Sequence, residues 1–326
     1  MKSKASGSLF RTPENAFEGN MNNETPVFSL IIPFFNAPGS DRREMMNELE
    51  SSIPDRSDLE VIWVNDHSRL EWSPSANFLR TRVKSIRNTP ERRYAGTARN
   101  TGLDHAAGTF VLFGDSDDLF RTDAMNCILD RARDTAETDL ILFRVSSFLE
   151  TGGIGDRHNY ITRIFEKLAA GGSHEALLRY YSPTGKILRR GHIDQNGLIF
   201  GDTKAGNDVI FSLSLALSSP RVTFVNETGY DIRQGNPSLT TIQSPENIRA
   251  RIQVARDAQL LLRSAKREDL AAPMHYILRR FFRQQPLVVF EEAILSVKTG
   301  ARIFSSPRKI MRNTAKKFID KWLNRQ

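Results

Sequence analysis

The sequence predicts an α/β fold in which helices cover a mainly parallel sheet. Short apolar runs rich in β-branched and aromatic residues lie at 27–35, 59–66 and 109–115, and each run ends in a polar turn. Helix-compatible stretches lie between these runs, at 41–52 and 95–107. Alternation of strands and helices is typical of βαβ units, whose crossover helices make neighbouring strands parallel.

Further elements follow along the chain. A weaker strand is expected at 83–88 and a stronger one at 139–148. Residues 201–217 are typical of a loop that leads into an apolar helix, and 221–234 indicate one or two strands. From Ser244 the apolar residues recur at helical spacing, with Ser244 as the N-cap and a proline at the first helical position.

Composition divides the chain into three parts. We expect a disordered polar tail at 1–25, a globular α/β domain at 26–243 and a basic helical extension at 244–326. From residue 271 to the end, 12 lysines and arginines face three acidic residues, so the +8 of the whole chain resides in this extension. The single cysteine, Cys127, excludes an internal disulfide framework and predicts a cytoplasmic protein.

The end of the chain has the pattern of an amphipathic basic helix. Five apolar residues recur at helical spacing among lysines and arginines: Met311, Ala315, Phe318, Ile319 and Trp322. Such a helix can lie in the interface of an anionic membrane, so we hypothesise peripheral attachment to the cytoplasmic face of the inner membrane. The alternative is that the stripe packs on the domain. Nucleic-acid binding is less favoured, because no series of base-stacking aromatic residues accompanies these charges.

Two of the predicted strands end in acidic turns, NDHS at 65–68 and DSDD at 115–118. The carboxyl ends of parallel strands form the ligand crevice of an open sheet, so both turns are expected to face the same place. Two aspartates spaced as Asp115 and Asp117 suit a hard divalent cation, which is most useful where phosphate charge must be neutralised. The alternative is an ordinary acidic turn in which Asp118 caps the next helix.

Several stretches resemble the family-2 glycosyltransferases, which are nucleotide-sugar-dependent enzymes with the GT-A fold. The most specific is AGTARNTGLDHAAGTFVLFGDSDDLF, residues 95–120, which is similar to the family's A-R-N-x-G and D-x-D-D block. SLIIPFFNAP and VIWVNDHS resemble two further motifs, and GKILRR, AGNDVIF and YDIRQGNPSLT resemble three weaker ones. The resemblance covers about residues 26–240 and implies a Rossmann-related, GT-A-like mixed sheet.

The resemblance implies a nucleotide-binding half that reaches about residue 125 and an acceptor-binding half after it. Pro33, Phe34 and Asn36 would line the pocket for the base, and Asp66 would form a hydrogen bond with the base. The simpler alternative is that Asn36 and Asp66 are turn formers, because their side chains readily accept hydrogen bonds from nearby backbone N–H groups.

The same resemblance places the donor phosphates beside the second acidic turn. Arg99 and Asp115 would contact the nucleotide, with Asp115 and Asp117 holding the ribose and a Mg²⁺ or Mn²⁺ ion and Asp118 beside them. The alternative for Arg99 is an ordinary surface arginine on a helix.

Asp208 is the predicted catalytic base. Transfer to an acceptor hydroxyl with inversion needs a carboxylate that takes the hydroxyl proton. In the family an E-D pair supplies this aspartate, and the corresponding residues here are Asn207 and Asp208, at the start of an apolar helix. A helix N-terminus favours the ionised carboxylate that a base requires. The alternative is that Asp208 is a plain N-cap residue.

Two motif positions depart from the family pattern. The V-D-D-G-S turn is Val-Asn-Asp-His-Ser, with His67 in place of glycine, and the E-D pair has lost its glutamate at Asn207. A third metal ligand is not indicated by the sequence.

The sequence as a whole predicts an inverting, metal-dependent hexosyltransferase. Its donor would be a nucleotide-diphosphate sugar, and its acceptor a saccharide or lipid-linked saccharide in polysaccharide, lipopolysaccharide or glycoconjugate synthesis. One alternative is a sugar-phosphate nucleotidylyltransferase, although the Gly-rich phosphate loop expected after its first strand is replaced by FNAP. The other is a non-catalytic adaptor that binds a membrane or nucleic acid through the basic tail.

Overall fold

The computed structural model describes residues 25–35, 42–68, 72–74, 78–89, 91, 93–135, 137–235 and 244–304. Three predictions therefore concern residues outside this part of the chain: the polar tail up to residue 24, Asn36 in the base pocket, and the amphipathic stripe after residue 304.

The described elements alternate as the sequence predicts. The strands are β1 (Phe28–Phe34), β2 (Leu59–Asn65), β3 (Arg82–Arg87), β4 (Phe110–Phe113), β5 (Leu119–Phe120), β6 (Leu140–Leu149), β7 (Lys186–Arg189) and β8 (Val222–Gln234). The helices are α1 (Arg43–Ser52), α2 (Tyr94–His105), α3 (Thr122–Arg133), α4 (Asn159–Ala169), the 3-10 helix η1 (His174–Arg179), α5 (Arg190–Gln195), α6 (Asn207–Leu217), α7 (Pro245–Ser264), α8 (His275–Phe282) and α9 (Pro286–Lys298).

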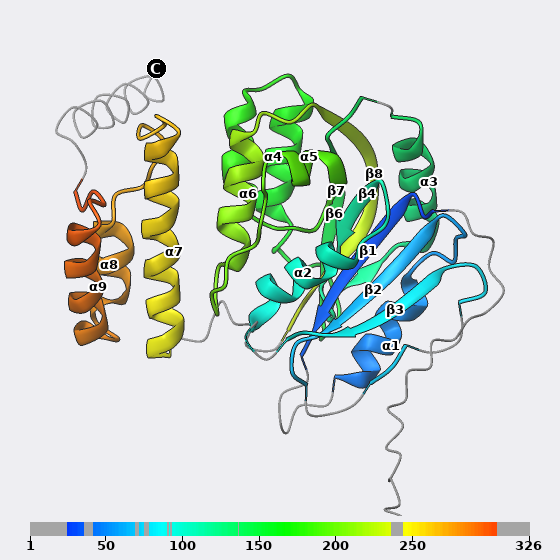
Figure 1. The fold of residues 1–326 in the computed structure, drawn as a ribbon, viewed down its shortest axis with the longest axis horizontal. Coiled ribbons are helices and arrows are strands. Elements are labelled where there is room, and N and C mark those ends of the chain that lie inside the picture. Colours follow the sequence, from blue (N-terminus) through cyan, green and yellow to red (C-terminus); the bar gives the residue numbers. More distant parts are fainter. Residues whose placement is uncertain are drawn as a thin grey trace, which may run out of the picture.

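The described strands form one sheet in the order β3-β2-β1-β4-β7-β6-β8-β5. Strands β3, β2, β1 and β4 are parallel neighbours, and β6 pairs with β8 in parallel. β7 runs antiparallel to β4 and β6, and β5 runs antiparallel to β8. The predicted mixed, mainly parallel α/β sheet is confirmed. In the view of Figure 1, α4, α5 and α6 lie on the side of the sheet toward α7, and α1 and α3 lie on the far side.

Each of the six predicted strand regions contains a strand, and the region 221–234 contains one long strand rather than two. β1 is buried along all of its residues, as a run of consecutive apolar side chains in a parallel sheet requires. β5 and β7 were not predicted, because they are only two and four residues long and their periodicity carries little signal.

α7 joins the sheet domain to the last two described helices (Figure 1). Its start is as predicted: the Ser244 hydroxyl accepts a hydrogen bond from the Asn247 N–H, and Pro245 is the first helical residue. Leu262 of α7 packs with Leu213 of α6, whereas Ile248 and Ile252 pack in a separate cluster with α8 and α9. α7 therefore has an apolar contact on each side.

A buried ion pair reinforces the contact between α7 and α9. The Glu292 side chain, only 4% exposed, accepts from Arg256 at 2.6 Å and from Arg249 at 3.1 Å. Its neighbour Glu291 also pairs with Arg249, at 2.7 Å, but is 60% exposed. Removing one partner of a buried pair leaves an uncompensated charge, whereas an exposed pair is screened by water.

We therefore expect Glu292→Ala to lower the free energy of unfolding by about 3–5 kcal/mol, because Arg256 would lose its buried partner. The matched variant Glu291→Ala should change it by less than about 1 kcal/mol. Urea denaturation combined with hydrogen exchange in α7 and α9 measures both effects. Similar losses for the two variants would show that the burial of Glu292 has no energetic consequence.

Candidate functional site

The acidic turn after β4 is held by β8. The backbone N–H of Asp115 donates to the Tyr230 hydroxyl at 2.8 Å, and the Asp118 carboxylate accepts from the Arg233 N–H at 2.8 Å. The Arg233 side chain donates to the Asp117 carbonyl at 2.7 Å. The N-cap of α3 is Arg121, so the alternative in which Asp118 caps the next helix is wrong.

Burial and neighbouring negative charge raise the pKa of two carboxylates of this turn, Asp117 and Asp118. Burial, and then the charges of Asp117 and Asp115, raise the pKa of Asp118 well above its usual value. Removal from water and the Asp115 charge also raise the pKa of Asp117, although its side chain is 41% exposed and lies 3.7 Å from Arg42. The turn therefore concentrates negative charge that the protein only partly compensates, and a cation would relieve it.

The donor atoms of this turn fit a divalent metal that takes most of its ligands from elsewhere. Among the described residues, no group of three His, Cys, Asp or Glu side chains is arranged to hold a metal ion. Because Asp118 is turned toward β8, Asp115 and Asp117 are the two carboxylates available. Hard cations such as Mg²⁺ are commonly held by one or two carboxylates together with phosphate oxygens and water.

Arg99 links this turn to α6. It lies on α2, is only 5% exposed, and donates to Asp115 at 2.5 Å and to the Asn207 side-chain carbonyl at 3.1 Å. The alternative of a surface arginine is therefore wrong. With both terminal nitrogens engaged, the Nε–H is the donor for which the described residues provide no acceptor.

Asn100 of the A-R-N-x-G motif and Gly96, which precedes the motif, position the segment before α6. The Asn100 side-chain amide forms two hydrogen bonds with the Phe200 backbone, at 3.0 and 2.9 Å. A Cβ atom on Gly96 would lie 2.2 Å from the Gly201 carbonyl oxygen, so only glycine permits this close approach. Sequence reasoning missed the role of Asn100, because its partner lies 100 residues away.

A group of packed aromatic rings lies against the Arg99 guanidinium. The Phe200 ring stacks on Phe211 of α6 at 4.0 Å and meets Phe113 of β4 edge-on at 5.0 Å. The Arg99 guanidinium lies 5.4 Å from the centre of the Phe200 ring. β4 and α6, which carry the acidic turn and Asp208, are therefore packed together through aromatic rings.

Asp208 is the second residue of α6, and the N-cap of this helix is Gly206, with φ of 75°. The alternative of a plain N-cap aspartate is therefore wrong. Burial raises the pKa of Asp208. The positive charge of Arg99 lowers this pKa, and the negative charge of Asp115 raises it. The predicted base and the acidic turn thus lie within each other's electrostatic range.

Three residues to which the sequence assigned no role lie within the electrostatic range of Asp208. Burial raises the pKa of Tyr160 to about 12, and the Asp208 charge adds to this shift. Burial likewise raises the pKa of Tyr181, on which Asp208 also acts. Burial lowers the pKa of Lys186 to about 7 against the opposing effect of Asp208, and its ammonium donates to the Tyr180 carbonyl at 2.7 Å. Because these residues come from three separate segments, only the fold brings them together.

The predicted base pocket is partly filled by core packing. Pro33 is buried, and the Phe34 ring is 2% exposed and packs edge-on against Trp63 and Trp72. The aromatic side chain of this segment that reaches solvent is Phe35, at 46% exposure. Phe34 is thus part of the core, and Phe35 is the neighbouring ring that is open to solvent.

Asp66 is half-buried at the end of β2. Its carboxylate accepts from the Asn88 side chain at 3.1 Å, and burial raises its pKa. The hydrogen bond that closes this turn runs instead from the Ser68 N–H to the Asn65 side chain. His67 adopts φ of 62°, a conformation that favours glycine, which explains why the family pattern has glycine at this position.

Comparison with known proteins agrees with this arrangement. The putative glycosyltransferase EpsH of Bacillus subtilis is 28% identical over 229 residues, which cover 64% of this chain and 61% of EpsH. Poly(ribitol-phosphate) beta-N-acetylglucosaminyltransferase TarS of Staphylococcus aureus is 25% identical over 228 residues, or 68% of this chain and 38% of TarS. The chain therefore spans less than two thirds of the length of either relative.

The fold is shared with a solved structure. The crystal structure of the S. aureus TarS fragment 1–349 in complex with UDP-GlcNAc matches with a TM-score of 0.53 at 20% identity, covering 80% of this chain and 74% of that chain. This likeness shows the GT-A fold. Residues 29–197, more than half of the chain, match the family model described as Glycosyl transferase family 2. The chain belongs to glycosyl transferase family 2.

Proposed function

We propose that the protein is an inverting glycosyltransferase that moves a sugar from a nucleotide-diphosphate donor to an acceptor hydroxyl. One observation carries this proposal: the Arg99 guanidinium joins Asp115, in the acidic turn, to Asn207, which precedes Asp208. The Arg99 guanidinium thereby holds the acidic turn, which would bind the diphosphate, and the start of α6, where Asp208 would accept the proton, in one arrangement. Sugar transfer needs both functions close to the anomeric carbon, one acting on the departing diphosphate and the other on the attacking hydroxyl.

The donor would bind at the edge of the sheet where β1, β2 and β4 end. Asp66 and Phe35 are the candidates for contact with the base, with Pro33, Phe34 and Asn36 shaping the pocket. Asp115 and Asp117 would hold Mg²⁺ or Mn²⁺, which neutralises the charge of the departing diphosphate when bound. The TarS complex with UDP-GlcNAc makes a UDP-sugar the first donor to test.

Asp208 would act as the base. The acceptor oxygen attacks the anomeric carbon from the face opposite the diphosphate and gives its proton to the Asp208 carboxylate. The bond between that carbon and the phosphate oxygen breaks, and the electron pair leaves with the nucleoside diphosphate. Burial raises the pKa of Asp208, and the positive charge of Arg99 opposes this rise and so favours the carboxylate form that accepts the proton.

The acceptor would lie against Tyr160 and Tyr181. Both rings are partly exposed, at 38% and 37%, and both respond to the charge of Asp208. Tyrosine rings offer sugars an apolar face and a polar edge. TarS is named for transfer to poly(ribitol-phosphate), so we propose a polymer saccharide or a lipid-linked saccharide as the acceptor.

We further propose a cytoplasmic enzyme that attaches peripherally to the cytoplasmic face of the inner membrane. Among the described residues, no helix combines the length and apolar character of a membrane span.

A panel of nucleotide sugars tests the proposed reaction directly. With Mn²⁺ present, one nucleotide sugar should raise the melting temperature of the protein more than the others, because a ligand that binds only the folded state stabilises it. The same compound should release nucleoside diphosphate in an acceptor-dependent assay. If no member of the panel stabilises the protein or is consumed, the proposed donor class is wrong.

Asp117→Asn should abolish metal-dependent nucleotide binding while the protein stays folded, because the amide cannot replace a carboxylate as an anionic ligand. Calorimetric titration of UDP with and without Mn²⁺ measures this loss. Asp123→Asn, an exposed aspartate in the first turn of α3, is the matched control. Unchanged metal dependence in the Asp117 variant would remove the metal role of this turn.

Asp208→Asn should leave donor affinity nearly intact and lower turnover by at least about 10², the usual effect of losing a general base. Wild-type turnover should fall as pH drops through a value above 3.8, because burial raises the pKa of Asp208 and protonation removes the base. This acid limb should be absent in the variant. Asp202→Asn, exposed in the loop before α6, is the control. Near-normal turnover of the Asp208 variant would exclude it as the base.

A further inference from the structure

The outward side of α9 is apolar and exposed. Leu287, Phe290, Ile294 and Val297, which we call the outer α9 face, are 77%, 65%, 42% and 63% exposed. They recur at intervals of three and four residues and so lie on one side of the helix. The opposite side carries Val288 and Val289, which are buried against α7 and α8. A contiguous apolar helix face that is open to solvent is typical of a surface that binds a partner or a membrane.

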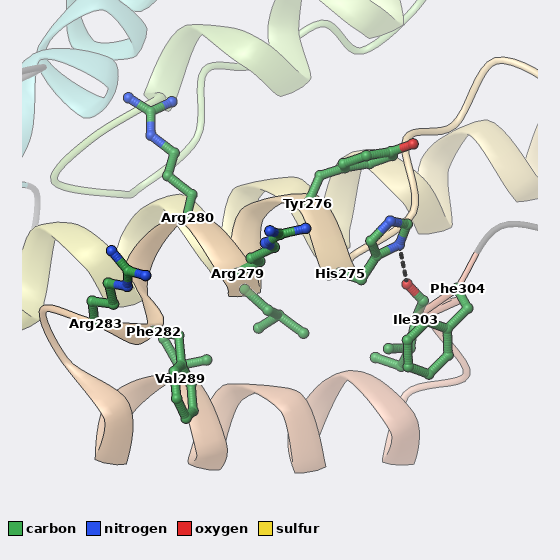
Figure 2. Close-up of a pocket in the computed structure, with 10 residues that line it drawn as sticks. His275, Tyr276, Arg279, Arg280, Phe282, Arg283, Val289, Ile303 and Phe304 are labelled. Atoms are coloured by element: carbon green, nitrogen blue, oxygen red, sulfur yellow. Dashed lines mark hydrogen bonds between the residues drawn. The ribbon is translucent and has the colours of Figure 1, made fainter.

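A groove adjoins this face. It has a volume of about 860 Å³ and lies between α8, α9 and the segment at 303–304 (Figure 2). Its apolar lining comprises Leu278, Phe282, Val289, Ile303 and Phe304. Phe282 and Phe304 are 57% and 71% exposed. α9 thus contributes Val289 to the groove and Phe290 to the outer α9 face.

The rim of the groove is basic. Arg279, Arg280 and Arg283 line it, and none of them forms an ion pair with a carboxylate in the described part of the chain. Figure 2 shows Arg280 and Arg283 extending away from α9. The two acidic residues of α9, Glu291 and Glu292, are turned toward Arg249 and Arg256 of α7. The surface thus combines apolar side chains with uncompensated positive charge.

The exposed apolar side chains and the basic rim favour one of three possible partners: the end of this chain, a second copy of the chain, or a membrane. The segment after residue 304 carries seven lysines and arginines and one aspartate, so it has the same sign of charge as the rim and would be repelled by it. A second copy related by twofold symmetry would bring the same arginines face to face. A bilayer with anionic headgroups offers both a negative surface for the guanidinium groups and an apolar interior for Phe282, Phe290 and Ile294.

We propose that the outer α9 face and the α8–α9 groove together form a surface that binds the bilayer of membranes containing anionic phospholipids. In Figure 1, α8 and α9 lie on the far side of α7 from the sheet domain, so the surface can meet a membrane without covering the acidic turn or Asp208. The proposal does not depend on sugar transfer. It also differs from attachment through the amphipathic stripe after residue 304, because it assigns the apolar contact to α8 and α9.

Sedimentation of the full chain with vesicles tests the surface. Wild-type protein should bind vesicles of equal parts phosphatidylcholine and phosphatidylglycerol, and bind phosphatidylcholine alone far more weakly. The variant Phe290→Glu/Ile294→Glu should bind the anionic vesicles at least about tenfold more weakly, since it puts charge where the acyl chains would lie. The matched control is Leu79→Glu/Ile154→Glu, at sites 85% and 83% exposed on the sheet domain. It should bind as the wild type does.

A second variant separates the charge from the apolar contact. Arg279→Gln/Arg283→Gln keeps the outer α9 face and should weaken binding to anionic vesicles, with a shallower dependence on salt. Thermal unfolding should show that each variant is folded, because the altered side chains lie at the surface.

Three results would overturn the proposal. The first is unchanged vesicle binding by Phe290→Glu/Ile294→Glu, with binding lost only when Lys316, Lys317 and Lys321 are changed to glutamine, which would assign attachment to the end of the chain. The second is a wild-type dimer that ignores vesicles and becomes monomeric in the Phe290/Ile294 variant. The third is equal binding of the wild type to neutral and anionic vesicles.

Discussion

The Arg99 guanidinium is the contact on which the site depends. A cation that is 5% exposed is costly to remove from water unless charge and hydrogen bonds compensate for it. Asp115, Asn207 and the face of Phe200 supply that compensation from three separate segments. Arg99 therefore fixes the acidic turn, the segment before α6 and the helix that carries Asp208 relative to one another. The glycine at position 96 matters because a Cβ there would separate these parts.

The neutral partner of Arg99 has an electrostatic consequence. In the family pattern a glutamate precedes the catalytic aspartate, and a carboxylate at that position would stand beside Asp208 and raise its pKa. Here the side-chain carbonyl of Asn207 accepts a hydrogen bond from Arg99 without carrying charge, and Asp115 forms the ion pair with Arg99. The remaining field of Arg99 acts to keep Asp208 ionised. The departure at position 207 is therefore compatible with a base at position 208.

The sequence predicted most of the strands from their local apolar pattern, and it predicted the candidate carboxylates from short motifs. Strands such as β1 and β2 are runs of consecutive apolar residues, so local pattern alone reveals them. Asp115, Asp117 and Asp208 were found because they lie in short motifs. Two kinds of feature could not be predicted. Phe34 was assigned to the pocket, but its packing against Trp63 and Trp72 depends on the tertiary fold. Tyr160, Tyr181 and Lys186 meet around Asp208 only after distant segments have packed.

If α8 and α9 bind a membrane as proposed, the two apolar contacts of α7 determine how far the proposed base, Asp208, lies from it. α7 packs on α6 through Leu262 and on α8 and α9 through Ile248 and Ile252. Packed helices lie about 8–10 Å apart, so two such steps hold α6 on the order of 16–20 Å from α9. The buried Glu292–Arg256 pair resists sliding of α9 along α7. With α9 in the interface, Asp208 would stand clear of the headgroups, so an acceptor hydroxyl could reach it only on a saccharide that extends well beyond its lipid anchor.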